Sequence, residues 1–327
     1  MDQNFSTERM KKLSLIIPVY NVEKYVAKCI QSCIDQNLNK TDYEIIIIND
    51  GSTDNSFEIV KAIAAGHENI TVFSQTNAGL SVVRNRGLEL AQGEYIWFID
   101  SDDWIETNCL QSITEKLTDI DVLAMGYVNA YDDTSKNKKI FPTSAVTNSG
   151  IDLLHNSYIV PAQFYIYKKE FLSENNLFFE PGIFHEDFEF IPRMLYFAKK
   201  LVVYNKQFYF FYKRPDSITA SINPKKSFDY IKIALNLIAF EKKNVKKTEK
   251  YIFHNVIWLA LTNALHNSLV MDGVTRVKLN KEFYFNKWMF KYLDSGTILK
   301  YRIERILFVI FPKHSVFIYR LLKRFVK

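Results

Sequence analysis

Three carboxylates stand within four positions, at Asp100, Asp102 and Asp103. The apolar run at residues 95–99 leads directly into them, which indicates a buried strand that ends in clustered acids. Like charges at this spacing raise one another's pKa, and a divalent cation that prefers oxygen ligands relieves the repulsion. The alternative is an acidic turn that caps the following helix, because Asp is a favourable N-cap residue. This stretch alone leaves both interpretations open.

Two strands predicted before this stretch also end in polar residues. The apolar runs at 13–19 and 44–48 lead into Tyr20-Asn21 and Asn49-Asp50-Gly51. Further predicted elements are strands at 70–73 and 121–127 and helices at about 22–36, 80–91 and 106–117. This alternation indicates a doubly wound, mainly parallel α/β sheet, and ligands bind such sheets beyond the carboxyl ends of the strands. We therefore expect the polar strand ends to share one edge.

The regular alternation of predicted strands and helices ends after residue 130. A polar stretch at 131–149 is expected to form a loop or hairpin, and His185-Glu186-Asp187 opens a helix that runs to Lys199. Other predicted elements are helices at 151–157 and 169–175, strands at 201–204 and 207–212, and helices at 226–243, 248–270, 281–292, 298–311 and 316–326. We place a boundary near residue 222, between an α/β domain at 1–222 and a helical C-terminal region at 223–327.

Six motifs, in this order and at this spacing, resemble the nucleotide-sugar glycosyltransferases of family 2. They are Pro18-Val19-Tyr20-Asn21, Asn49-Asp50-Gly51-Ser52-Thr53-Asp54, Asn77-Ala78-Gly79-Leu80-Ser81, Arg84-Asn85-Arg86-Gly87, Asp100-Ser101-Asp102 and His185-Glu186-Asp187. The resemblance covers about residues 13–220. It implies the GT-A fold, which is Rossmann-like, and an inverting transfer from a nucleotide-sugar to an acceptor hydroxyl, a reaction of the hexosyltransferase class.

The resemblance also assigns a donor site. Its nucleotide-sugar-binding residues would be Pro18, Tyr20, Asn21, Asp50, Gly79, Arg84, Asp100, Ser101 and Arg214. Tyr20 would stack on the base, unless it is a buried tyrosine with a tethered hydroxyl. Asp50 would accept the imide N–H of uracil, which favours a UDP-sugar. Arg84 would approach the diphosphate or position the acceptor-side loop, and its alternative is a surface ion pair on a helix.

Asp100 and Asp102 match the DxD motif of the family. The resemblance implies that Asp102 ligates Mg²⁺ or Mn²⁺, which in turn binds the diphosphate. Asp100 would hold the ribose hydroxyls or support the metal shell, and Arg214 would belong to a loop over the diphosphate. A bound cation of this kind stabilises the charge that builds on the departing nucleoside diphosphate. Asp103 stays open between this site and a helix cap.

Asp187 is the candidate general base, since inverting transfer needs one carboxylate to take the proton from the attacking acceptor hydroxyl. Glu186 is adjacent and stays a second candidate. Neighbouring residues on a helix point about 100° apart, so only one of them can face the sugar. The alternative is that both acids merely favour a helix N-terminus.

Several other classes of protein fit the sequence less well. No G-x-G-x-x-G follows the first strand, which disfavours a dinucleotide-dependent oxidoreductase. A sugar-nucleotide nucleotidyltransferase is disfavoured because Tyr20-Asn21 stands where a Gly-rich basic loop is expected. A non-catalytic scaffold on a transferase fold is disfavoured by the intact acids at Asp50, Asp102 and Asp187. No Q-x-x-R-W motif is present, which favours transfer of a single sugar per encounter.

The basic character of the chain is confined to its end. From Leu299 onward, eight Lys and Arg stand against one acid, so the net charge of this tail is +7. The net charge of the whole chain is +6, so residues 1–298 sum to about −1. The apolar residues of the tail recur at helical spacing (Leu299, Ile303, Ile306, Leu307 and Ile310, then Ile318, Leu321, Leu322 and Phe325). Such a tail suits an anionic membrane surface and a glycan or lipid-linked acceptor, or else packs its apolar face on the body. The near-neutral body disfavours nucleic acid.

The remaining features suggest a location. Met1 to Lys12 is polar, and no apolar run approaches the roughly 20 residues of a spanning helix. Cys29, Cys33 and Cys109 lack the spacing of a redox or zinc motif and are expected to be buried thiols. We therefore expect a cytoplasmic protein, peripheral at the inner face of the cell membrane.

Overall fold

The computed structural model describes residues 10–142, 149–156, 160–214, 223–292 and 299–325. The chain divides into two compact units. The sheet unit comprises residues up to Gly182 together with Phe197–Arg214, and the helical unit comprises Ile183–Tyr196 and the chain beyond Pro215. The boundary predicted near residue 222 lies outside the described residues, and the segment that holds Glu186 and Asp187 belongs to the helical unit.

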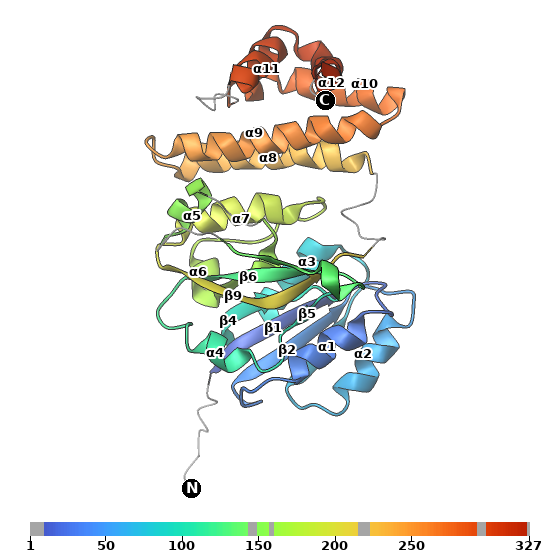
Figure 1. The fold of residues 1–327 in the computed structure, drawn as a ribbon, viewed down its shortest axis with the longest axis vertical. Coiled ribbons are helices and arrows are strands. Elements are labelled where there is room, and N and C mark those ends of the chain that lie inside the picture. Colours follow the sequence, from blue (N-terminus) through green and yellow to red (C-terminus); the bar gives the residue numbers. More distant parts are fainter. Residues whose placement is uncertain (1–9, 143–148, 157–159, 215–222, 293–298, 326–327) are drawn as a thin grey trace. The chain divides into compact units, whose positions relative to one another are not determined.

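Four parallel strands form the first half of the sheet, in the order β3-β2-β1-β4. They are β1 (Lys11–Val19), β2 (Tyr43–Asn49), β3 (Ile70–Ser74) and β4 (Gly93–Phe98). β2 is buried along its whole length, as its run of isoleucines predicts for a strand covered on both faces. Figure 1 shows helices α1 (Val26–Ile34) and α2 (Ser56–Ala64) on one face and α3 (Leu80–Leu90) on the other.

The second half of the sheet is mixed. The order continues β4-β8-β6-β9-β5, and β8 runs antiparallel to both β4 and β6, whereas β6 and β9 are parallel. Its elements are β5 (Trp104–Ile105), α4 (Leu110–Thr114), β6 (Val122–Ala130), β7 (Lys138–Ile140), α5 (Gly150–Asn156), β8 (Tyr165–Lys168), α6 (Lys169–Glu174) and β9 (Leu201–Tyr212). The strands expected at 201–204 and 207–212 are therefore one continuous strand.

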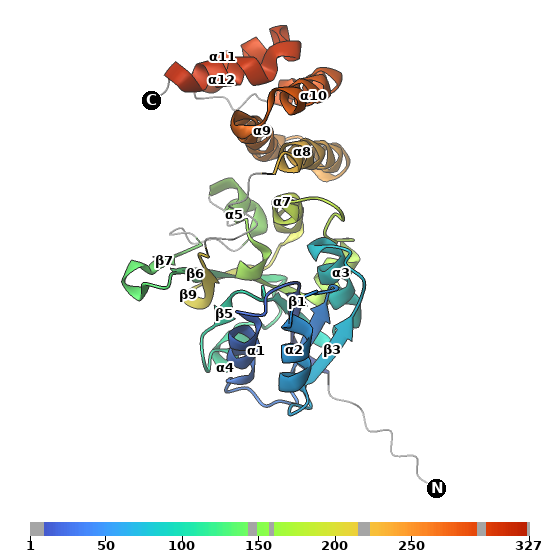
Figure 2. The same cartoon turned by 90° about the vertical axis from the view of Figure 1, so that its right-hand side faces the viewer.

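The helical unit is built around the pair α8 (Lys225–Asn244) and α9 (Lys250–Asn267), which lie side by side (Figure 2). The other helices are α7 (Glu186–Phe197), α10 (Gly273–Phe285), α11 (Leu299–Ile310) and α12 (Ser315–Phe325). The helix expected at 281–292 is wrong, because α10 ends at Phe285 and a 3₁₀ segment follows at Lys287–Tyr292. Within the described part of the chain, no helix combines the length and apolarity that crossing a membrane requires.

The first testable prediction concerns the contact between β1 and β4. A Cβ added at Gly93 would lie 2.5 Å from the backbone nitrogen of Ser14 and 2.7 Å from the carbonyl carbon of Leu13. Because backbone atoms cannot turn aside, we expect Gly93→Ala to lower the free energy of unfolding by about 1–3 kcal/mol. Gly66→Ala is the control, since no atom lies within 4 Å of the added Cβ. Urea unfolding that gave equal stabilities for the two variants would contradict this account.

Candidate active site

The polar strand ends meet at one edge of the sheet. β1 pairs in parallel with both β2 and β4, so their carboxyl ends lie on the same side. The backbone N–H of Asp50 donates to the carbonyl of Val19 at 2.8 Å, which continues the pairing past the end of β2. The N–H of Ile99 likewise donates to Ile16 at 2.9 Å, just before Asp100. The expectation of a shared edge is confirmed.

Asp50 is a buried carboxylate that organises the loop before α3. Its Oδ1 accepts hydrogen bonds from Gln75 Nε2 at 2.8 Å and from the N–H of Ala78 at 2.9 Å. Its Oδ2 accepts the N–H of Gly79 at 2.9 Å, where φ is +89°. A carboxylate has about four acceptor positions. These three bonds leave room for one further donor.

The turn after β1 presents Tyr20 to solvent. Its side chain is 48% exposed, so the alternative of a buried tyrosine is wrong. Asn21 adopts φ of +50°, and its Oδ1 accepts the N–H of Thr53 at 2.8 Å. Pro18 is buried inside β1, opposite Ile48. Residues at the ends of β1 and β2 thus hold the turn in place, and the Tyr20 side chain lies in solvent.

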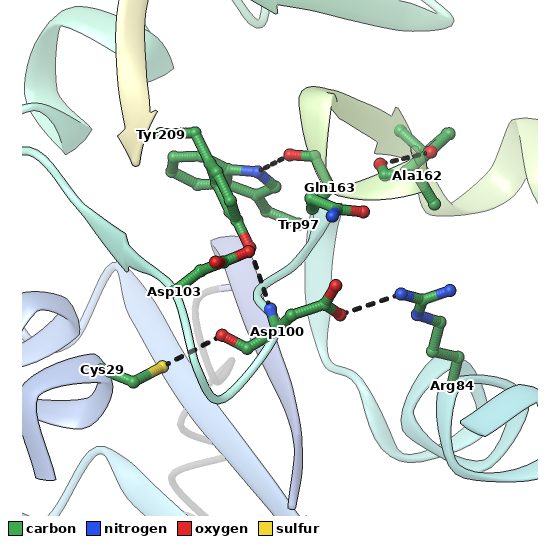
Figure 3. A network of polar contacts seen from close by, with 9 residues as sticks. Cys29, Arg84, Trp97, Asp100, Asp103, Ala162, Gln163 and Tyr209 are labelled. Atoms are coloured by element: carbon green, nitrogen blue, oxygen red, sulfur yellow. Dashed lines mark hydrogen bonds and ion pairs between the residues drawn. The ribbon is translucent and has the colours of Figure 1, made fainter. Parts of the chain in front are cut away.

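Asp103 points inward and anchors the acidic turn. Its Oδ2 accepts the hydroxyl of Tyr209 at 2.7 Å, and its Oδ1 accepts the N–H of Tyr212 at 2.8 Å. The same Tyr209 hydroxyl accepts the N–H of Asp100 at 3.0 Å (Figure 3). Asp103 does not cap a helix, because β5 follows it and α4 begins only at Leu110. β9 therefore holds both ends of the turn through one tyrosine. We call Tyr209, with its bonds to Asp100 and Asp103, the clamp.

Burial raises the pKa of Asp103 well above its usual range, and the charges of Asp102 and Asp100 add to the shift. Burial also raises the pKa of Tyr209. The indole of Trp97 packs 6.2 Å from the Tyr209 ring and donates from Nε1 to the carbonyl of Gln163 at 2.8 Å. Cys29, a buried free thiol as expected for all three cysteines, donates from Sγ to the carbonyl of Asp100 at 3.5 Å.

Asp100 and Asp102 keep their carboxylates partly exposed, at 22% each. Arg84 Nη2 lies 2.9 Å from Asp100 Oδ1, and Arg214 Nε lies 2.8 Å from Asp102 Oδ2. Arg84 is buried, so the alternative of a surface ion pair is wrong. Burial raises the pKa of Asp102, the charge of Asp100 raises it further, and Arg214 opposes both. Ser101, between the two acids, is itself buried.

This pair of carboxylates fits a divalent cation that arrives with a diphosphate. Mg²⁺ in nucleotide sites is held by one or two carboxylates, with substrate phosphates completing the shell. The repulsion between Asp100 and Asp102 is of the kind that a cation relieves. In the described residues, no three Asp, Glu, His or Cys side chains converge on one point, so phosphate oxygens would have to supply the other ligands.

The other predicted site residues lie in the helical unit. Glu186 and Asp187 form the first turn of α7, where Glu186 is buried and Asp187 is half-buried. His185, just before them, adopts φ of +62°. Burial and the charge of Lys226 lower the pKa of His185 to about 4, while Asp229 opposes the shift. His185 is thus uncharged at neutral pH.

A family comparison fits this arrangement. The chain matches the model described as glycosyl transferase family 2 over residues 14–186, more than half of its length. The chain belongs to glycosyl transferase family 2. The resemblance inferred from the motifs is therefore confirmed, and so is the expectation of a glycosyltransferase.

Relatives of this family 2 glycosyltransferase include YibD of Escherichia coli strain K12, described as an uncharacterized glycosyltransferase. The two chains are 29% identical over 303 residues, which are 86% of each. A poly(ribitol-phosphate) beta-glucosyltransferase of Bacillus spizizenii is 31% identical over 221 residues, 64% of this chain but 34% of that enzyme. This chain thus spans most of one relative and about a third of the other.

Solved structures share the fold of this family 2 protein. Staphylococcus aureus TarS 1–349, in complex with UDP-GlcNAc, aligns with a TM-score of 0.68 at 22% identity, over 95% of this chain and 87% of TarS 1–349. The mannosyltransferase PcManGT from Pyrobaculum calidifontis, in complex with GDP-Man and Mn²⁺, aligns with a TM-score of 0.54 at 14% identity, over 96% and 88%. The α/β fold of GT-A type is confirmed.

Sequence reasoning missed the most central residue of the site. Tyr209 stands 109 positions after Asp100 along the chain, within an aromatic strand that offers no motif. Gln75, which bonds Asp50 and also accepts from Arg86 at 2.8 Å, was missed for the same reason. The one available signal was Asp103, a buried acid that caps no nearby helix and therefore needs a partner elsewhere in the chain.

The second testable prediction concerns the Tyr209 hydroxyl. Tyr209→Phe leaves Asp103 and the N–H of Asp100 without this partner, which we expect to cost about 1–3 kcal/mol of stability. Because the turn carries the exposed acids, we also expect UDP with Mn²⁺ to bind at least about tenfold more weakly in calorimetry, which corresponds to 1.4 kcal/mol. Tyr43→Phe is the control, since it removes a buried hydroxyl at the start of β2. Unchanged nucleotide affinity in Tyr209→Phe would be evidence against the clamp.

Proposed function

We propose that this enzyme transfers a sugar from a UDP-sugar to an acceptor hydroxyl with inversion, by a metal-assisted single displacement. The observation that carries the proposal is the acidic turn after β4. One acid of the turn is locked inward, and two are held at the strand edge where such sheets bind ligands. That edge also carries Tyr20 and Asp50, which the resemblance associates with the nucleotide.

The base would bind between Tyr20 and Asp50. The exposed Tyr20 ring offers a stacking surface at the end of β1. The remaining acceptor position of Asp50 would receive the imide N–H of uracil, which cytosine lacks. The complex of TarS with UDP-GlcNAc supports a uridine nucleotide, whereas the PcManGT complex contains GDP-Man. The nucleotide is therefore the first point to test.

Asp102 would hold Mn²⁺ or Mg²⁺, with Asp100 supporting it or binding the ribose hydroxyls. A cation bound there would neutralise charge on the leaving diphosphate. Arg214, which pairs with Asp102, would also meet a phosphate oxygen, as the resemblance implies. Arg84 is buried against Asp100 and fixes that carboxylate, so we assign it a supporting role at the donor site.

Asp187 would act as the base. The acceptor oxygen forms a bond to the anomeric carbon, the bond from that carbon to the diphosphate breaks, and the acceptor proton passes to the Asp187 carboxylate. We prefer Asp187 to Glu186 because Glu186 is buried and Asp187 is the more exposed of the two. Relatives such as the poly(ribitol-phosphate) beta-glucosyltransferase support a role in glycan or polysaccharide assembly.

The third testable prediction concerns the nucleotide. We expect UDP with Mn²⁺ to raise the melting temperature by about 5 °C at 100 times its dissociation constant. CDP, a matched ligand without the imide N–H, should give little shift, and Asp102→Asn should remove the UDP shift. A panel of UDP, GDP, CDP and dTDP measures this. Stabilisation by GDP without stabilisation by UDP would contradict the assignment of Asp50.

The fourth testable prediction concerns the base. We expect Asp187→Asn to lower UDP release from UDP-glucose, UDP-galactose or UDP-GlcNAc by about 100-fold or more, the usual contribution of a general base. UDP affinity should stay within about twofold, since the step lost is proton transfer. Glu186→Gln is the matched control and should keep most activity. Loss of activity in Glu186→Gln but not in Asp187→Asn would assign the role of base to Glu186. No turnover by the wild type would favour a non-catalytic scaffold.

We also propose that the enzyme works at the inner face of the cell membrane, on a lipid-linked or other glycan acceptor. The apolar stripe of α11 supports this, because Ile303, Ile306 and Ile310 are 46%, 55% and 59% exposed. Phe308 and Glu304, on the opposite side of α11, are buried, and Phe308 packs 5.4 Å from the Phe290 ring. The exposure of these three residues favours membrane docking over the packing alternative for the stripe of α11.

Charge supports an anionic lipid surface as the partner. Among the described residues 303–323, the cations Arg305, Lys313, Arg320 and Lys323 retain exposure, and the acid Glu304 is buried. A second copy of this surface would meet like charges. α11 has 12 residues, about 18 Å, which is shorter than the roughly 30 Å of a bilayer core. The helix would lie in the interface with its apolar stripe among the lipid headgroups.

The fifth testable prediction concerns this stripe. We expect Ile306→Asp with Ile310→Asp to weaken binding to phosphatidylglycerol-containing vesicles by about tenfold or more, because two apolar side chains lose their burial. Leu259→Asp with Val270→Asp is the control, since both residues are exposed elsewhere in the helical unit. Vesicle flotation measures binding. Equal loss in both double variants, or no binding by the wild type, would contradict the proposal.

A further inference from the structure

The segment that leads into α7 has an unusual backbone. His185 has φ of +62°, a region that residues other than glycine seldom occupy. Its carbonyl accepts the N–H of Phe188 at 3.0 Å, so His185 lies just before the first residue of α7, Glu186. Such a conformation persists only where neighbouring groups hold it. The start of α7, and with it the direction of the Asp187 side chain, thus depends on what holds His185.

The ring of Tyr230 on α8 holds His185 by stacking. The two ring centroids are 4.6 Å apart with planes inclined by 19°. Tyr230 also meets the edge of Phe188 on α7, with centroids 5.6 Å apart. Tyr230 is buried, so its ring is itself fixed. Since His185 is uncharged at neutral pH, it packs here as an aromatic ring.

A second contact from α8 fixes the residue before His185. The buried carboxylate of Asp229 accepts the backbone N–H of Phe184 through Oδ2 at 2.8 Å. Lys225 Nζ lies 2.5 Å from the same oxygen and 5.2 Å from the centre of the Phe184 ring. A buried carboxylate is costly unless it is paired in this way. Two successive residues of α8 thus hold the two residues that precede Glu186.

We propose that Asp229 and Tyr230 are positioning residues that set the register of α7, so that Asp187 rather than Glu186 faces the reacting sugar. This inference rests on the proposed role of Asp187 as the base. A shift of the helix start by one residue would turn each side chain by about 100°, which is enough to exchange the two acids. Two residues of the helical region beyond residue 222 would then position the base, although the family model ends at residue 186.

The variants Asp229→Ala and Asp229→Asn distinguish a positioning role of Asp229 from a general effect on stability. Asp229→Ala removes the acceptor of the Phe184 N–H, and we expect kcat for UDP release from UDP-glucose, UDP-galactose or UDP-GlcNAc to fall about tenfold or more. The KM for the donor should stay within about twofold. Asp229→Asn keeps a carbonyl acceptor for that N–H, so it should retain kcat within about threefold.

Glu241→Ala is the matched control. Glu241 is a buried acid on the same helix, paired with Lys250 at 2.8 Å. We expect it to lower stability without lowering kcat. Amide hydrogen exchange provides a second measurement that needs no turnover, and the N–H of Phe188 should lose protection in Asp229→Ala but not in Glu241→Ala.

The outcomes distinguish this inference from the function on which it rests. Full activity in Asp187→Asn would overturn the assignment of the base and with it the reason for positioning. An inactive Asp187→Asn together with an Asp229→Ala variant of wild-type kcat would overturn the positioning role alone. Equal loss of kcat in Asp229→Ala and Glu241→Ala would also overturn it, because the effect would then be general.

Discussion

One tyrosine hydroxyl holds together the acidic turn on which the candidate site depends. Tyr209 accepts the N–H of Asp100 and donates to the carboxyl of Asp103, so it closes the turn at both ends. Without this contact, three carboxylates would follow a buried strand with their charges in close proximity. With it, Asp103 is buried and points inward, and burial and the two neighbouring acids raise its pKa. The two remaining acids are then directed to the strand edge, where a cation and a phosphate can reach them.

Strand β9 links this turn to the rest of the sheet. It contributes Tyr209 and the backbone of Tyr212 to Asp103, and Arg214, just beyond its end, pairs with Asp102. β9 is paired with β6 from Leu201 to Tyr212, with an irregularity at Gly126, so the clamp is anchored in the sheet. Asp100 has a different counter-ion, the buried Arg84 on α3. The side chain of Arg84 is 1% exposed and that of Arg214 is 16% exposed, so the pair of Asp102 is the more open to solvent.

The sequence predicted the parts of the site that depend on local pattern. The isoleucine run of β2 and the apolar run before Asp100 identified two parallel strands, which flank β1, and their polar ends identified the edge. Tyr209 was missed and the role of Asp103 was left open because these two partners stand 106 positions apart in the chain. The short strands β5 and β8 gave too few residues for a periodic signal. The pattern of α11 predicted an apolar face but could not predict that this face stays uncovered, since that depends on the neighbours of Phe308.

The central claim is that the clamped turn presents Asp102 to a cation that carries the diphosphate. The most direct measurement is a crystal structure with UDP and Mn²⁺, using the anomalous signal of manganese to place the ion. We expect a manganese peak within about 2–2.5 Å of an Asp102 oxygen and of the diphosphate, as hard cations with oxygen ligands show, with Tyr209 still bonded to Asp103. A bound UDP whose manganese contacts neither Asp102 nor Asp100 would contradict it.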